Sequence, residues 1–415
     1  MNFIHPNPAR FACRLQGNGR ICPSKRTGGK PGQQSGRTAM TAQLADEASI
    51  VDRILRHIDA KSTDLSDGIW HEPVAHYLAQ DRFAAEIEHV FRRTLTPFCP
   101  SAALAEIGAY VARDAALTPV VAIRGADGVA RAFRNACRHR GVQLVDGAGC
   151  KKALTCRYHG WTYGLDGRLR RIPDDYGFPG LDKDTHGLVP VTCIERNGLV
   201  FVSQDDPAAT SEAGGMPTLF GDDWKLYATT AQEVEANWKI VAEGFLEGYH
   251  IRSTHQDTFY PLQYDNLNVI EPFGRNSRIS FPYRRIEKLR NVPPGERRTA
   301  GMLTHVYHLF PNVMLSTFPT NRLMAVLEPL AVDRTRLVTY TLSNQIAAED
   351  GRTAVAQGRD FVTAGAGEDR EMACAAQRGL ATRANAQFTF GLFEGAIRHF
   401  HQNLAAIIES RTGAR

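Results

Sequence analysis

Hydrophobic and polar positions follow different periods along the chain, and these periods divide it into three regions. Between residues 45 and 93, apolar side chains such as Ile50, Ile54 and Ile58 recur at helical spacing. From about 96 to 205 the pattern changes to short runs typical of strands, at 120–123, 154–163 and 199–202, with turn signals between them. The first two regions are therefore predicted to be a helical segment and a small antiparallel β domain.

The third region begins after residues 206–218, whose Ala, Gly, Pro and Ser content predicts a linker. Segments at 305–314, 322–330 and 336–343 have the composition of strands, and a helical stretch is predicted from Asp369 to about Ser410. A sheet curled around a long helix would enclose an apolar cavity. The predicted fold class is α+β, with a basic tail at 1–42, N-terminal helices at 43–95 that pack on the larger domain, a small β domain at 96–205 and a larger domain at 206–415.

Composition narrows the class of protein. Of 415 residues, 43% are hydrophobic and 22% charged, as in globular proteins, and no stretch approaches the ~18 consecutive apolar residues of a membrane span. The first 42 residues carry seven Lys or Arg and no acid, which leaves a net charge of −2 on the rest. This tail precedes Met40 and is typical of disorder or of an upstream start codon. The nearly neutral remainder has no recognisable nucleic-acid module, so no nucleic-acid partner is predicted.

Two short boxes each combine one cysteine with one histidine: Cys137-Arg-His139 and Cys156-Arg-Tyr-His159. Two thiolates and two imidazoles could hold a structural zinc ion, or a [2Fe–2S] cluster with both cysteines on one iron and both histidines on the other. The mixing of ligand types within each box favours the cluster, because zinc fingers more often pair like with like. The other six cysteines show no framework spacing, which indicates a reducing, cytoplasmic location.

A second group of candidate ligands follows the apolar run that starts at Asn237. His250 and His255 lie five residues apart, which on an ideal helix separates their side chains by about 140°. The two imidazoles can converge only if the helix ends or unwinds near His250. Two histidines and one carboxylate on one face are the usual ligands of non-haem Fe(II) in oxygenases.

The boxes and their flanks resemble the α subunits of Rieske-type ring-hydroxylating oxygenases. The resemblance rests on the segments 135–141, 156–163 and 237–255; Arg157 departs from it, since the family usually has proline there. It implies a Rieske [2Fe–2S] domain and a helix-grip catalytic domain. It also implies Asp369 as the third iron ligand, with the neighbouring Glu368 as an alternative register. Glu247 matches an acid, usually aspartate, that links a Rieske histidine to an iron histidine across a subunit boundary, and Glu247 and Asn237 are the expected catalytic residues.

The expected function is that of an oxygenase component. No dinucleotide fingerprint, P-loop or plant-type ferredoxin box appears, so a separate NAD(P)H-dependent reductase, with or without a ferredoxin, must supply electrons. The resemblance implies a homotrimer that hydroxylates an organic substrate, with aromatic hydrocarbon catabolism as the first expectation. The alternatives are a monooxygenase or demethylase acting on a quaternary amine or methoxy compound, and a non-catalytic electron carrier. A docking rim for an acidic electron donor is one interpretation of the basic residues near the boxes, and a solvated basic face is the other: Arg138, Arg140, Lys151, Lys152, Arg157, Arg168, Arg170 and Arg171.

Overall fold

Two seven-stranded antiparallel sheets organise the computed structural model, which describes residues 44–205, 216–346 and 349–413. The first sheet has the strand order β2-β11-β10-β5-β4-β3-β6, and a three-stranded sheet, β7-β8-β9, carries the second cysteine–histidine box at one end. The bounds are β2 (Thr96–Pro100), β3 (Ala109–Ala115), β4 (Thr118–Arg124), β5 (Ala130–Arg134), β6 (Gly147–Cys150), β7 (Leu154–Thr155), β8 (Thr162–Tyr163), β9 (Leu169–Arg171), β10 (Pro190–Arg196) and β11 (Leu199–Ser203). Short 3₁₀ helices lie in loops of the two domains: η2 (Ser101–Leu104), η3 (Asp175–Gly177), η4 (Lys183–His186) and η7 (Pro294–Glu296).

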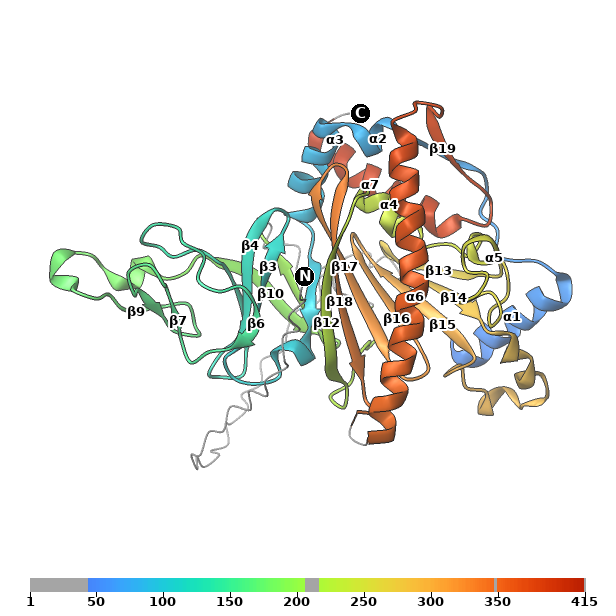
Figure 1. Cartoon of the computed structure of the whole chain (residues 1–415), viewed down its shortest axis with the longest axis horizontal. Helices are drawn as coiled ribbons and strands as arrows, with labels where there is room; N and C mark the ends of the chain where they lie inside the picture. The colour runs from blue at the N-terminus through green and yellow to red at the C-terminus, as the bar shows by residue number, and fades with distance from the viewer. Residues whose placement is uncertain (1–43, 206–215, 347–348, 414–415) are drawn as a thin grey trace, which may run out of the picture. The chain divides into compact units, whose positions relative to one another are not determined.

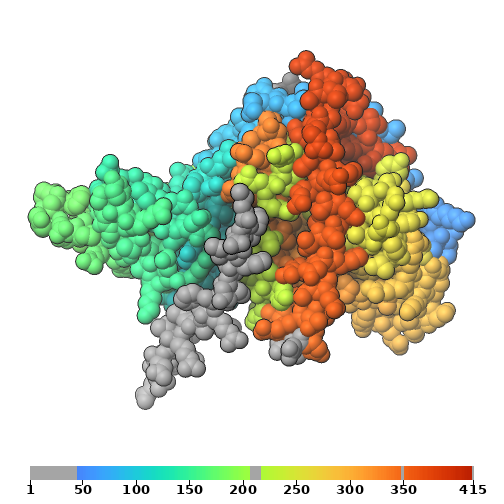
Figure 2. Space-filling view, viewed as in Figure 1, coloured from blue at the N-terminus to red at the C-terminus, as the bar shows by residue number. Residues whose placement is uncertain are grey.

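The second sheet belongs to the larger domain and has the order β12-β18-β17-β16-β15-β14-β13. The long helix α6 (Glu349–Leu380) runs across this sheet, and its outer side is exposed along one face of the molecule (Figures 1 and 2). The strands are β12 (Lys225–Val234), β13 (Val269–Phe273), β14 (Asn276–Pro282), β15 (Leu303–Leu309), β16 (Val313–Thr317), β17 (Arg322–Ala331) and β18 (Arg334–Ser343). The remaining helices of this domain are α4 (Trp238–Glu243), α5 (Ile251–Thr254), the 3₁₀ helix η6 (Arg284–Asn291) and α7 (Gly395–Thr412).

One apolar core joins the two sheets. Phe98 and Phe201 of the first sheet pack in the same buried cluster as Leu315 and Val338 of the second. Burying apolar side chains from both sides stabilises the contact by roughly 25 cal/mol per Å² removed from water. The two domains are therefore held by a continuous core rather than by a thin polar contact.

N-terminal helices cover the larger domain. Asp46 caps α1 (Glu47–Ala60) by accepting from the Ser49 backbone N–H, and Ile50 and Ile54 are buried against Val269 and neighbouring residues. The chain then forms β1 (Trp70–Pro73), which pairs with β19 (Gln387–Phe390), and the helices α2 (Ala75–Leu78), α3 (Gln80–Ala85) and the π-helix η1 (Glu86–Phe91).

The α+β class, with a small antiparallel β domain and a sheet crossed by a long helix, is confirmed. The predicted helical stretch from Asp369 to about Ser410 is wrong in its bounds, because α6 begins twenty residues earlier and β19 separates it from α7. The sequence pattern did not predict the first half of α6, because four glycines between 351 and 367 weaken the helical propensity of that segment. The run at 154–163 is two short strands around a loop, and the tail at 1–42 falls outside the described residues. In the described part of the chain, no helix has the length and apolarity needed to cross a membrane.

Candidate metal centres

Two loops of matching geometry carry the cysteine–histidine boxes. The Cys137 carbonyl accepts from the Gly141 N–H at 2.8 Å, and the Cys156 carbonyl accepts from the Gly160 N–H at 2.9 Å. Both glycines have positive φ, +75° and +73°, a conformation that side chains with Cβ adopt only with strain. Each loop therefore folds back on itself within five residues and presents its cysteine and histidine on one side.

The two imidazoles face each other across the gap between the loops. His139 Nδ1 lies 3.1 Å from His159 Nδ1, and the ring centroids are 4.7 Å apart. Trp161 stacks on the His139 ring at 4.9 Å and fixes its plane. Two Nδ1 atoms aimed at one point are the arrangement that a common iron atom requires.

Burial separates the thiols from the imidazoles. Cys137 and Cys156 are each 3% exposed, whereas His159 is exposed. The Arg138 backbone N–H donates to the Tyr163 hydroxyl oxygen at 2.9 Å, which leaves the hydroxyl proton free to reach Cys137 Sγ at 3.3 Å. A hydrogen bond to a ligating sulfur stabilises the thiolate and raises the potential of an iron–sulfur cluster. These loops fit a cluster whose cysteine iron is buried and whose histidine iron is near solvent.

The second centre forms where the helical run after Asn237 breaks. Helix α4 ends at Glu243, and α5 is a single turn with His250 at its N-terminal cap and His255 at its C-terminal cap. The predicted break near His250 is confirmed, and it brings the two rings to a centroid distance of 5.1 Å. Two histidines that an unbroken helix would have separated therefore converge.

A carboxylate from α6 completes this group. Asp369 Oδ1 lies 2.9 Å from His255 Nε2 and 3.5 Å from His250 Nε2. The three residues form a group able to hold a metal ion, with ligand atoms within 4.8 Å of one another. Glu368 lies on another side of the helix, where it contacts His255 Nδ1 at 2.7 Å and accepts from the Thr258 hydroxyl at 2.6 Å. Of the two acids, Asp369 faces both Nε2 atoms.

Both histidines use their two ring nitrogens in the same way. His250 uses Nδ1 for Glu247, and His255 uses Nδ1 for Glu368, so both Nε2 atoms are left for the shared point. His255 is fully buried, and its Nε2 has no hydrogen-bond partner among the described residues although Asp369 is 2.9 Å away. A buried nitrogen and a carboxylate oxygen that are close but not aligned for a hydrogen bond suit a metal between them.

The histidines and carboxylates of this centre shift one another's pKa. Burial alone would lower the pKa of His250, but contacts with Asp369 and Glu247 raise it to about 10. Burial would raise the pKa of Asp369, yet the two histidines hold it below its ordinary value. Without a metal the group keeps a proton on imidazole beside two carboxylates, and a divalent cation would replace that proton with a larger charge.

Asn237 is not brought to this group. Its side chain caps α4 by accepting from the Lys239 N–H, and its amide donates to the carbonyls of Tyr77 and Val332. The Asn237 side chain is fully buried, and its oxygen and nitrogen are both hydrogen-bonded, so it positions α4. This capping role replaces the catalytic role expected from the sequence. Its sequence signal was that of a helix N-terminus.

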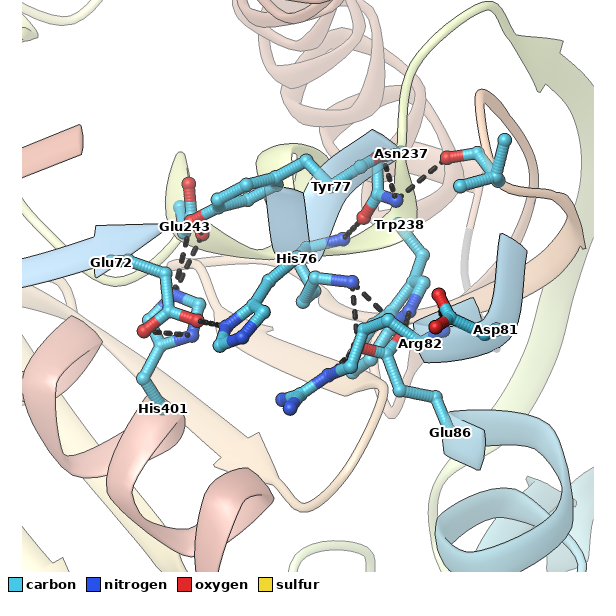
Figure 3. A network of polar contacts seen from close by, with 12 residues as sticks. Glu72, His76, Tyr77, Asp81, Arg82, Glu86, Asn237, Trp238, Glu243 and His401 are labelled. Atoms are coloured by element: carbon cyan, nitrogen blue, oxygen red, sulfur yellow. Dashed lines mark hydrogen bonds and ion pairs between the residues drawn. The ribbon is translucent and has the colours of Figure 1, made fainter. Parts of the chain in front are cut away.

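Sequence reasoning missed a buried polar network behind α4. Glu243 Oε1 accepts from the Tyr77 hydroxyl at 2.6 Å and contacts His401 Nε2 at 2.8 Å, while Glu72 lies 3.5 Å from His401 Nδ1 (Figure 3). A second branch joins Glu86 to α4, also in Figure 3. The members come from three distant segments of the chain, so no local pattern could have revealed them.

A pocket of about 120 Å³ opens onto the metal group. Its wall includes four phenylalanines and small polar side chains, and no Lys or Arg from the ranges that the structure describes. Phe259 packs on the His255 ring at 4.6 Å, close to α6, because Gly365 leaves room for it: a Cβ there would lie 2.4 Å from the Phe259 ring. The pocket residues are Gly244, Phe245, Glu247, His250, Ile251, His255, Phe259, Gln263, Phe281, Thr304, Val306, Ser316, Phe318, Leu323, Ala325, Leu337, Thr339, Val362, Ala366 and Asp369.

Known proteins match both halves of the chain. Residues 94–181 match the family described as Rieske [2Fe-2S] domain, and residues 221–410 match Ring hydroxylating alpha subunit (catalytic domain). The carnitine monooxygenase oxygenase subunit of Escherichia coli (strain K12) is 30% identical over 370 residues, 82% of this chain and 94% of that protein. The glycine betaine monooxygenase oxygenase subunit of Chromohalobacter salexigens is 34% identical over 196 residues, 45% of this chain and 43% of that protein.

Solved structures share the fold. A quaternary ammonium Rieske monooxygenase in complex with L-carnitine superimposes with a TM-score of 0.70 at 24% identity, covering 82% of this chain and 96% of that one. Naphthalene 1,2-dioxygenase from Rhodococcus sp. gives a TM-score of 0.69 at 19% identity, covering 87% and 98%. At these identities the structures establish the architecture, while the sequence relatives establish the family.

Proposed function

Since the chain belongs to the α subunits of Rieske-type ring-hydroxylating oxygenases, we propose that it inserts one oxygen atom of O2 into a C–H bond beside the nitrogen of a quaternary amine. It is an oxygenase component with a Rieske cluster and a mononuclear iron as cofactors. Two electrons and two protons convert the second oxygen atom to water. Loss of the hydroxyl proton from the oxidised carbon would form a carbonyl group and break the C–N bond, so that an aldehyde and a tertiary amine are released. If the oxidised carbon is an N-methyl group, this cleavage is demethylation.

The observation that carries the proposal is the aromatic pocket beside the converging ligands. Phenylalanine rings attract a quaternary ammonium group through the ring quadrupole. Four of them line the pocket, and no Lys or Arg of the described residues lines it. A cavity of ~150 Å³ can hold benzene, so about 120 Å³ suits either a small ring or a trimethylammonium group. The named relatives act on carnitine and glycine betaine, which favours the amine. Aromatic hydrocarbon catabolism, the first expectation from the sequence, finds no support in these relatives.

In this proposal each ligand has one role. Cys137 and Cys156 would hold one iron of the cluster, and His139 and His159 would hold the other. His250, His255 and Asp369 would hold the mononuclear iron beside the pocket. Bound there, the iron supplies the site where O2 is reduced.

The outer carboxylates orient the iron ligands. Glu368 and Glu247 each contact a histidine Nδ1, which fixes the tautomer that directs Nε2 to the metal. Glu247 Oε2 also accepts from the His250 N–H at 3.1 Å, so the acid holds both the ring and the start of α5.

Subunits of this family take electrons from a reductase and form multimers. We propose a head-to-tail trimer, in which the exposed His159 of one subunit lies near Glu247 of the next. Support comes from the separation of the β7–β9 end from α5 in Figure 1, and from exposed apolar side chains on each side. Tyr158 and Tyr176 are 54% and 85% exposed near the cluster loops, and Tyr249 is 58% exposed beside Glu247. Aromatic side chains such as tyrosine are enriched in protein–protein interfaces, so these exposed rings support a contact at each end.

The basic residues around the cluster loops support an electron-donor site. All eight are exposed, from Arg138 to Arg171. We propose that they dock a reductase or ferredoxin with an acidic surface, since complementary charge raises the association rate. The reduction rate should then fall with ionic strength, and an unchanged rate would refute docking by charge.

The test is turnover by the purified chain after loading with iron. Iron and sulfide analysis should give about three irons and two sulfides per chain, whereas an electron carrier would hold about two irons. Quaternary amines and small arenes are then supplied separately with O2 and a surrogate reductase, and products are identified by mass spectrometry. Oxygen uptake coupled to C–N cleavage supports the proposal. Dihydroxylated arenes with no amine oxidation would refute it.

A further inference from the structure

A second cavity of about 570 Å³ adjoins the iron pocket on its outer side. The two share Phe318 and Val362, and the Tyr283 hydroxyl of the outer cavity is 2.8 Å from Thr304 Oγ1 of the inner one. We call the outer cavity the vestibule. It is lined by Pro261, Leu262, Tyr283, Arg284, Arg285, Phe318, Pro319, Thr320, Ala354, Gln357, Gly358, Phe361 and Val362.

Two arginines give the vestibule its charge. Arg284 and Arg285 begin η6 and line the cavity, and no acid of the described part of the chain lines it. The guanidinium of Arg284 lies over the Tyr260 ring at 5.3 Å and donates to the Tyr260 carbonyl at 3.3 Å. The guanidinium of Arg285 lies over the Tyr283 ring at 4.8 Å. Aromatic faces hold both planes while leaving donors free.

Neighbouring arginines that do not line the vestibule are paired with acids. Arg290 contacts Asp59 at 2.8 Å and Glu287 at 3.3 Å, and Arg297 contacts Asp52. Among the described residues, no carboxylate lies within ion-pair distance of Arg284 or Arg285. Two adjacent guanidinium groups without an acid therefore face a cavity that leads to the reacting centre.

Helix α6 contributes residues to the vestibule and to the iron ligands, so its rise per residue gives the distance between them. Phe361 and Val362 line the vestibule, and Asp369 faces the iron histidines seven to eight residues later. At 1.5 Å per residue this is about 10–12 Å along the helix axis. Figure 2 shows the first half of α6 beside the segment that contains η6. A substrate reaching from iron pocket to vestibule would be of comparable length.

We propose that the vestibule binds an anionic group of the substrate, a carboxylate, while the quaternary ammonium end lies in the iron pocket. This inference rests on the proposed function and narrows its substrate class to zwitterions with the two charges well separated. Guanidinium is suited to this task because its fork of donors matches both carboxylate oxygens. The pairing also orders the substrate, because a phenylalanine-lined pocket alone would accept either end of a neutral chain.

The experiment compares ω-trimethylammonium carboxylates having one to six methylenes with the neutral alcohols of equal length. Binding to the iron-loaded, full-length protein is measured by titration calorimetry without reductant, so that it does not depend on turnover. Oxidation of the same probes is followed by oxygen uptake and product analysis. The variants are Arg284→Gln and Arg285→Gln, with Arg290→Gln as the matched control outside the vestibule.

The expected result is a preference for carboxylate over alcohol of about tenfold or more at the best length. Each vestibule variant should weaken carboxylate binding and raise KM by about tenfold, with alcohol binding and kcat little changed. The preference should decrease in high salt because the arginines are exposed. The control should behave as the wild type does.

Two outcomes separate this inference from the proposed function. If alcohols bind and react as well as carboxylates, or if the control variant weakens carboxylates equally, the vestibule site is refuted and amine oxidation stands. If no probe is oxidised, the proposed function fails. The calorimetric preference and its loss in the vestibule variants then decide the inference alone.

Discussion

Glu86 is the most informative residue to change, because it is a fully buried acid that holds the start of α4. Its two oxygens accept from Lys239 Nζ, both at 2.8 Å, from Trp238 Nε1 at 2.9 Å and from Arg82 Nε at 3.0 Å. The side chains of Glu86 and Lys239 are both 0% exposed. Glu86→Gln keeps the shape but removes the charge and turns one acceptor into a donor facing other donors.

The expected cost follows from leaving a buried ammonium group unpaired. Breaking a buried ion pair by removing one partner typically costs about 3–5 kcal/mol. Because unfolding entropy is about 2 cal/mol/K per residue, this corresponds to a fall in Tm of about 4–6 °C for a chain of this length unfolding as one unit. Glu88→Gln, two residues along the same π-helix, is the control. Glu88 is 46% exposed and pairs with Arg93 at 2.7 Å, so its loss should cost about 0–1 kcal/mol.

The assay is urea and thermal unfolding of the iron-loaded protein. Burial lowers the pKa of Lys239, and Glu86 opposes that effect. With Glu86→Gln the pKa of Lys239 should fall further, so the unfolded state binds more protons than the folded state over a wider range below about pH 10.5. Stability of the variant should therefore recover as pH rises toward about 10. Equal costs for Glu86→Gln and Glu88→Gln, within about 1 kcal/mol, would refute the reasoning.

Three further changes test the metal centres and the pocket. Tyr163→Phe removes a hydrogen bond to a cluster thiolate and should lower the reduction potential of the cluster by about 40–60 mV, equivalent to about 1–1.4 kcal/mol. The potential is measured by voltammetry, and an unchanged value would show that the hydroxyl does not donate to sulfur. Asp369→Ala should abolish binding of the third iron, whereas Glu368→Gln should weaken it by about 10–100-fold, as measured by iron titration; the reverse order would exchange their roles. Gly365→Ala places a Cβ 2.4 Å from an aromatic ring and should reduce kcat/KM for bulky substrates. Gly367→Ala places a Cβ that meets no atom of the described residues within 4 Å and should only stabilise α6, by up to about 1 kcal/mol. Identical kinetics for both variants would contradict the packing argument.

Local motifs are sufficient to indicate the cofactors of this protein. The cysteine–histidine boxes need only a short loop each, so spacing alone identified Cys137, His139, Cys156 and His159 as one set of candidate ligands. The runs of strand-forming residues likewise predicted β17 and β18 almost to their ends, because burial of a strand in a sheet gives its sequence a recognisable local pattern. The convergence of His250 and His255 was also foreseeable, since five-residue spacing demands a break in the helix.

Tertiary structure alone decided which carboxylate faces the histidines and what surrounds them. Glu368 and Asp369 are adjacent in sequence, and only the rotation of α6 against α5 separates the side facing both Nε2 atoms from the side facing one Nδ1. The motif around Asn237 predicted a catalytic role, but its side chain caps α4. The sequence could not show this, because its partners, the carbonyls of Tyr77 and Val332, are distant in the chain. The pocket and the vestibule are likewise assembled from strands and helices that are distant in the sequence. Ligand type and spacing are local properties of a sequence, whereas orientation, burial and cavity shape depend on contacts that exist only after the chain has folded.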